Sequence, residues 1–147
     1  MPGESPAPVW IIDNEQWPRA TLRAELLARG YEVVGFHRVL HALARLNDAG
    51  VPRPAIVVLE LRDQPVSPAL LGALRETGLP VILLGGAVEL SDPSLAAVLA
   101  VAVAVLRRPF SVGDVVNAVA RVASPDISPP EPPSAPPAAG DRPPEQS

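Results

Sequence analysis

The sequence contains no cysteine and no lysine, and only 3% of its 147 residues are aromatic. Without cysteine the chain forms no disulfide, no thiolate metal site and no cysteine nucleophile. All twelve basic residues are arginine, and the net charge is −4. Nucleic-acid binding needs clustered positive charge, which scattered arginines on an acidic chain do not supply, so we expect no nucleic-acid partner.

Long apolar runs are also missing. The longest, residues 95–106, has twelve Ala, Val and Leu residues, whereas a membrane-spanning helix needs about twenty. Residues 1–8 lack the basic patch and the apolar run of a signal peptide. We therefore expect no membrane association, and a cytoplasmic location follows by default.

The composition divides the chain into three parts. Residues 9–123 have the apolar content for one packed core, whereas residues 124–147 carry nine of the twenty prolines and Ile127 as their only large apolar residue. Such a segment cannot bury enough surface to offset chain entropy, so we expect this tail and the leader 1–8 to be disordered. The P-x-x-P spacings of the tail suit proline-recognition modules, but a semi-rigid tether is the favoured interpretation.

Residues 54–63 are predicted to contain the central strand. Residues 55–59 are all apolar, three of them are β-branched, and the run ends at Glu60. An uninterrupted run of this kind is typical of a strand buried on both faces of a parallel sheet. Because function in open α/β sheets gathers at the carboxyl ends of central strands, Glu60 is the first candidate site residue.

Four further strands are predicted at 9–12, 32–36, 79–84 and 103–106. A helical pattern follows each strand, and Ser67-Pro68, Asp92-Pro93 and residues 111–114 supply helix starts. Within 95–106 the pattern fits helix or strand, and we divide the run near residue 100. Five strands alternating with five helices predict a doubly wound α/β fold with a five-stranded parallel sheet.

Four short motifs resemble the receiver domain of bacterial two-component response regulators. They are the acidic end of the first strand (11–15), the central strand (57–61), the fourth strand (80–84) and Arg108-Pro109-Phe110. The resemblance covers residues 9–123. It implies a flavodoxin-like topology with the strand order 2-1-3-4-5.

The resemblance also implies where a phosphorylation site would lie. In receivers the first strand ends in two acidic residues that hold Mg²⁺, the third in the phosphorylated aspartate, the fourth in Ser or Thr, and the fifth in Lys-Pro. These positions fall here on Asp13 and Asn14, Glu60, Gly85 and Arg108, and the aromatic switch position falls on Val105. Only Asp13 is unchanged, so the resemblance is to a degenerate receiver, or pseudo-receiver.

These changes weaken phosphoryl chemistry for physical reasons. Glu60 is one methylene longer than aspartate, and a displacement of about 1 Å in a reacting site costs about a hundredfold in rate. Asn14 is neutral, and Mg²⁺ prefers charged oxygen ligands. We expect no cofactor, with a weak Mg²⁺ site on Asp13, Glu60 and a backbone carbonyl left open.

The paired changes at Glu60 and Arg108 suggest a specific hypothesis. A longer acid and a forked base can form a permanent ion pair that replaces the contact between phosphoryl group and lysine. The alternative is that both are relics at a solvent-facing strand end, where such a pair contributes only about 0–1 kcal/mol.

Other residues are weaker candidates. His37 and His41 have the spacing of a metal pair on a helix but no evident third ligand. Asp63 could replace Glu60 as phosphoacceptor only if it reached the same pocket. Trp10 is expected in the core, and Trp17 either packs or contributes to a partner surface.

We expect a stand-alone signalling domain that acts by protein–protein interaction without being phosphorylated. Its surface would be the side formed by the fourth helix, fifth strand and fifth helix, which receivers use for homodimers and partner docking. The alternative is a phosphorelay component that still accepts phosphate weakly. A cofactor-binding flavodoxin-like domain is disfavoured, because the acidic residues 13–15 repel phosphate and Gly85-Gly86 lacks the rest of a nucleotide motif. We expect no enzyme activity.

Overall fold

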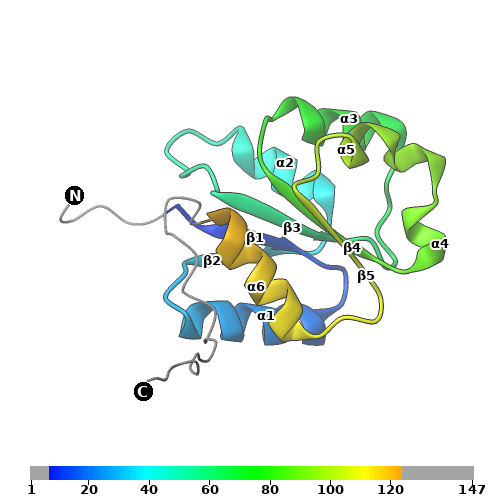
Figure 1. The fold of residues 1–147 in the computed structure, drawn as a ribbon. Helices are drawn as coiled ribbons and strands as arrows, with labels where there is room; N and C mark the ends of the chain where they lie inside the picture. The colour runs from blue at the N-terminus through cyan, green and yellow to red at the C-terminus, as the bar shows by residue number, and fades with distance from the viewer. Residues whose placement is uncertain (1–6, 124–147) are drawn as a thin grey trace, which may run out of the picture.

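The computed structural model describes residues 7–123, which form an all-parallel five-stranded sheet with the order β2-β1-β3-β4-β5 and helices on both faces (Figure 1). The strands are β1 (Val9–Ile12), β2 (Val33–Phe36), β3 (Ile56–Glu60), β4 (Val81–Gly85) and β5 (Ala104–Arg107). The helices are α1 (Gln16–Ala28), α2 (Val39–Leu46), α3 (Pro68–Glu76), α4 (Ala87–Leu90), the 3₁₀ turn η1 (Pro93–Leu95), α5 (Ala96–Leu99) and α6 (Val112–Ala123). The predicted fold class and strand order are confirmed.

The sheet separates two cores. Alternate residues of β1 point to opposite faces, so Trp10 and Ile12 pack in the core under α2, α3 and α5, while Val9 and Ile11 pack under α1 and α6. All five residues of β3 are buried, as expected for a central parallel strand. Trp10 lies in the core as predicted, with its ring centroid 4.7 Å from that of Phe36.

Two predicted helix starts are formed by local hydrogen bonds. Ser67 caps α3 by accepting from the Leu70 amide at 3.1 Å. At the start of α6, the Ser111 amide donates to Asp114 Oδ2 at 2.9 Å and the Asp114 amide donates to Ser111 Oγ at 3.0 Å. This reciprocal arrangement satisfies backbone donors that the first helical turn leaves unpaired.

The segment between β4 and β5 differs from the prediction of a single helix over residues 92–100. A short helix, α4, comes first, and its Glu89 side chain accepts from the Gly86 amide at 2.6 Å. Asp92 then caps only the 3₁₀ turn η1, which continues into the four-residue α5. Alternating small and β-branched residues give no strong helical stripe here, so the caps determine where each short helix begins. Strand β5 lies one residue later than predicted.

None of the helices within residues 7–123 is long and apolar enough to cross a membrane. The predicted tail, 124–147, and most of the predicted leader lie outside the described residues.

Candidate functional site

The predicted site residues gather at the carboxyl edge of the sheet. Asp13 directly follows β1 and Glu60 ends β3, and these strands are neighbours, with Ile12 opposite Leu59. Gly85 ends β4, and Arg108 directly follows β5. Asp13 and Glu60 are only 5% and 3% exposed. The two carboxylates therefore lie at the ends of neighbouring parallel strands, as the confirmed strand order 2-1-3-4-5 requires.

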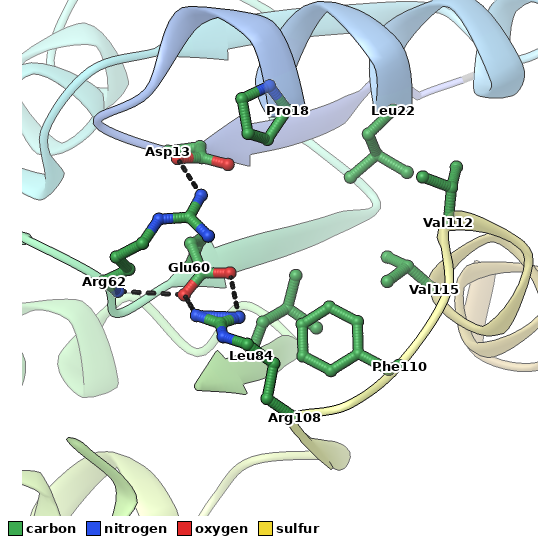
Figure 2. A pocket seen from close by; sticks show the side chains of 10 residues that line it. All are labelled: Asp13, Pro18, Leu22, Glu60, Arg62, Leu84, Arg108, Phe110, Val112 and Val115. Atoms are coloured by element: carbon green, nitrogen blue, oxygen red, sulfur yellow. Dashed lines mark hydrogen bonds and ion pairs between the residues drawn. The ribbon is translucent and has the colours of Figure 1, made fainter. Parts of the chain in front are cut away.

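Glu60 and Arg108 form a two-pronged ion pair (Figure 2). Arg108 Nη1 donates to Glu60 Oε1 at 2.9 Å, and Nη2 donates to Oε2 at 2.6 Å. The Arg62 amide donates to the same Oε2 at 2.9 Å. The planar fork of arginine matches a carboxylate in this way, whereas a lysine ammonium does not. The pair hypothesised from the two changes is present, and Glu60 does not face solvent.

Arg108 has further neighbours that hold its guanidinium in place. Nη2 lies 3.8 Å from Glu89 Oε1, and the guanidinium carbon lies 5.2 Å from the centre of the Phe110 ring, a cation–π distance. The side chain of Arg108 is about one-third exposed, so this arm forms the rim of the site while Glu60 lies beneath it.

Arg62 belongs to the site, although the sequence reasoning did not single it out. Its Nη2 lies 3.5 Å from Asp13 Oδ1, and its Nε lies 3.1 Å from Glu15 Oε2, within ion-pair distance but without hydrogen-bond alignment. Arg62 thus places a positive charge beside the acidic turn that follows β1. The sequence feature that could have indicated Arg62 is its position two residues after Glu60, in the loop that follows β3 next to the end of β1.

Burial raises the pKa of both carboxyl groups above their ordinary values. For Asp13, the amide hydrogen bond from Glu15 at 2.9 Å and the nearby Arg62 guanidinium partly offset the effect of burial on the pKa. For Glu60, the Arg62 amide and then Arg108 offset the rise in pKa. Desolvation disfavours the charged form of an acid, so part of the ion-pair attraction at this site compensates for burial.

The remaining positions implied by the resemblance, Gly85, Val105 and Asn14, hold no charged side chain. A Cβ added at Gly85 would lie 3.3 Å from Leu61 Cδ1 and from Leu90 Cγ, and 3.4 Å from Glu89 Oε1, so side chains already fill this position. Val105 is 45% exposed on the edge strand. Asn14 is half-buried and forms no side-chain hydrogen bond within residues 7–123.

The residues of this site do not fit Mg²⁺. This ion takes six oxygen ligands in a nearly ideal octahedron, yet both oxygens of Glu60 accept hydrogen bonds from Arg108 or the Arg62 amide. Asp13 Oδ1 accepts from the Glu15 amide and lies near Arg62. Among the carboxylate oxygens of Asp13 and Glu60, only Asp13 Oδ2 is left without a hydrogen bond from the described residues.

The structure separates the weaker candidates from this site. His37 precedes α2 while His41 lies inside it, so the two are not on one helical face, and residues 7–123 contain no group of three side chains suited to a metal. Asp63 is exposed in the loop after β3, with a left-handed φ of 54°. Trp17 is 81% exposed and does not pack in the core.

Gln64 is a buried polar residue that the sequence reasoning missed. Its Oε1 accepts from the Val39 amide at 2.9 Å, and its Nε2 donates to the His37 carbonyl at 3.0 Å. These two bonds join the loop after β3 to the start of α2. The role of Gln64 is thus to position the loop that carries Arg62.

Scans of protein-family models and of curated proteins found no match to this chain. Solved structures of receiver domains are similar in fold. A response regulator receiver domain protein from Clostridium thermocellum has a TM-score of 0.65 at 20% identity, over 82% of this chain and 96% of that one. Chemotaxis protein CheY4 from Vibrio cholerae has a TM-score of 0.63 at 23% identity, over 80% and 99% of the two chains. The receiver domain of nitrogen regulatory protein C has a TM-score of 0.66 at 26% identity, over 80% and 94%. The chain therefore has the fold of response regulator receiver domains.

Proposed function

We propose that this chain is a pseudo-receiver, a signalling domain that acts by binding a protein partner or a second copy of itself without phosphoryl transfer. It keeps the receiver fold, but its own side chains hold the site in one state.

The bidentate pair of Glu60 and Arg108 carries this proposal. A phosphoacceptor must present a carboxylate oxygen to the donor, and here both oxygens of Glu60 already accept hydrogen bonds. Phosphorylation would first have to break this charge-assisted pair, whose Glu60 end is buried and whose Arg108 end is partly exposed. Arg108 thereby takes the place of both the phosphoryl group and the lysine that contacts it.

Arg62 supports the same proposal from the other side of the site. In phosphoryl transfer a metal ion neutralises the charge that develops on the oxygens. Arg62 places its guanidinium 3.5 Å from Asp13 Oδ1 and 3.1 Å from Glu15 Oε2. We infer that this tethered cation substitutes for the divalent ion, which leaves the acidic turn neutralised without a cofactor.

The surface that would bind a partner lies around β5. β5 is an edge strand of the sheet and carries the exposed Val105, and the exposed Leu99, Val101 and Val103 lie shortly before it in the chain. We call these four residues the apolar strip, because exposed apolar residues at a sheet edge are of the kind that marks protein contacts. This strip is the proposed docking surface.

A phosphorylation assay tests the proposal. The full chain is incubated with acetyl phosphate and Mg²⁺ and its intact mass is measured, beside a receiver domain that retains the aspartate, the second acid and the lysine. We expect no phosphoryl group on this chain. A gain of one phosphoryl group, lost in Glu60→Gln, would support the alternative of a weakly phosphorylated phosphorelay component.

A second assay addresses the surface. Light scattering after size-exclusion chromatography compares the wild-type chain with Val103→Ser and Val105→Ser, at matched concentrations. A dimer that dissociates in both variants, but not in the control Val88→Ser on α4, would identify the strip as a contact between copies. If the wild type and all three variants are monomers, the strip is not a contact between copies, and the proposed partner is a different protein.

A further inference from the structure

A cavity of about 180 Å³ lies beside the ion pairs, whose residues form part of its wall, between the carboxyl end of the sheet, α1 and the start of α6 (Figure 2). Its walls are mostly apolar and consist of Pro18, Leu22, Leu84, Phe110, Val112 and Val115. An apolar cavity of roughly 150 Å³ is large enough to hold benzene. The volume therefore suits one ring or a branched aliphatic group of similar size.

The polar groups that line the cavity differ in how much hydrogen-bonding capacity they retain. Glu60 uses both of its oxygens. Asp13 accepts at Oδ1 from the Glu15 amide and lies near Arg62, but Oδ2 has no partner among the described residues. Figure 2 shows this second oxygen directed toward the cavity, on the side of Pro18. Asp13 as a whole is only 5% exposed.

The carboxylates and the arginine side chains of the site differ in how exposed they are to solvent. The two carboxylates lie at the inner end of the site, whereas the side chains of Arg62 and Arg108 are about 30% exposed and form its rim. Because Asp13 lines the same cavity as the apolar residues, a ligand whose apolar part fills the cavity can place a polar group next to Asp13 Oδ2. Asp13 Oδ2 accepts no hydrogen bond from the described residues and is accessible from the pocket, so a charged N–H donor on a ligand is a suitable partner for it.

We propose that this cavity binds a small primary amine with a compact apolar body, whose ammonium group donates to Asp13 Oδ2. The apolar body fills the space between Leu22, Phe110 and Val115, and the ammonium lies one or two carbons from it. This ligand site goes beyond the proposed docking function. Phe110 lines the cavity and lies in the short loop between β5 and α6. A bound metabolite would therefore alter the conformation of this loop and of the end of β5.

The test uses the full chain with ¹³C-labelled methyl groups, observed by NMR. Leu22, Val112 and Val115 line the cavity and supply methyl signals. Benzylamine is the probe, and benzyl alcohol, benzoate and MgCl₂ are compared with it at the same concentrations. We expect saturable shifts of these methyl signals with benzylamine, weaker shifts with benzyl alcohol, and none with benzoate.

Two variants locate the binding. Asp13→Asn keeps the side-chain shape and removes the charge, so the affinity for benzylamine should fall at least about tenfold, because hydrogen bonds to charged groups contribute about 1.5–3 kcal/mol. Val112→Phe adds a bulky ring at a residue that lines the cavity and should abolish binding. This second variant keeps the proposal testable if Asp13→Asn fails to fold. Asp48→Asn, an exposed acid just after α2, is the matched control and should bind as the wild type does.

Several outcomes would overturn the proposal. These are binding that is unchanged in Val112→Phe, tighter binding of benzoate than of benzylamine, competition by MgCl₂ at equal concentration, or the absence of any saturable shift. None of these results bears on whether the chain accepts a phosphoryl group, which the mass assay decides separately.

Discussion

Glu60 and Arg108 are 48 residues apart in the chain and meet through two hydrogen bonds of 2.9 and 2.6 Å. The pair joins the end of β3 to the residue after β5, so it connects the centre of the sheet to its edge. A cross-link of this kind stabilises one arrangement of the β5 side, the side that carries the exposed apolar strip. The structure thereby relates Glu60, at the position that corresponds to the phosphoacceptor of receivers, to the proposed docking surface.

The first prediction concerns the strength of this pair. In a double-mutant cycle with Glu60→Gln and Arg108→Gln, we expect a coupling energy of about 1–2 kcal/mol, because Glu60 is buried but Arg108 is partly exposed. Denaturant unfolding of the four proteins measures the coupling. The pair Arg45 and Asp48, exposed and 4.0 Å apart, is the control and should show almost none. Additive effects at Glu60 and Arg108 would mean that the pair does not hold the site.

The second prediction concerns pH. Burial raises the folded-state pKa of Glu60 above its ordinary value of 4.5, so the folded protein binds this proton more tightly than the unfolded chain does. The stabilisation that comes from this tighter proton binding is fully present below about pH 4.5, where Glu60 is protonated in both states. It is lost as the pH rises through the raised pKa of the folded protein. Relative to Glu60→Gln, the wild-type free energy of unfolding should therefore fall as the pH rises across this window. Urea unfolding at a series of pH values measures it. The opposite slope would show that Arg108 and the Arg62 amide outweigh burial.

The third prediction concerns Arg62 as a tethered cation. Arg62→Gln removes the guanidinium that lies 3.5 Å from the buried Asp13 carboxylate and leaves Arg19 as its remaining cationic neighbour. We expect a loss of about 1–3 kcal/mol in the free energy of unfolding. Arg75→Gln, an exposed arginine of α3, is the control and should change stability by less than about 0.5 kcal/mol. In thermal unfolding, Mg²⁺ should not raise the Tm of the wild type, whereas it should raise the Tm of Arg62→Gln. An equal rise in both proteins would contradict the substitution of Arg62 for the ion.

Much of this architecture was predictable from local sequence patterns. The buried run before Glu60, the caps at Ser67 and Ser111, and the acidic turn after β1 each depend on neighbouring residues, and a parallel sheet brings strand ends to one edge. The ion pair of Glu60 and Arg108 was also predictable, because both residues follow strands that end at the same side of the sheet and their side chains carry opposite charges.

Other features depend on contacts that no local pattern encodes. Arg62 became part of the site because β3 adjoins β1 with a particular register, which places its side chain between Asp13 and Glu15. The short helix α4 begins where the Glu89 side chain accepts from the Gly86 amide. In the run of Ala, Val and Leu that follows, no residue type marks where the helix ends and β5 begins. The cavity depends on how α1 and α6 pack, which is a property of tertiary structure alone.

The last prediction concerns Gly85, where receivers have a hydroxyl residue. A Cβ at this position would lie 3.3 Å from Leu61 and from Leu90, closer than most real contacts, so Gly85→Ser should lose about 1–2 kcal/mol of stability through overpacking. Gly72 in α3 has no atom within 4 Å of an added Cβ, and Gly72→Ala should instead gain about 0.5–1 kcal/mol, because alanine favours helix. Denaturant unfolding of the two variants beside the wild type gives both values. A neutral Gly85→Ser would mean that Leu61, Leu90 and Glu89 move aside readily, in which case the hydroxyl position is still open and the pocket is less fixed than the ion pair implies.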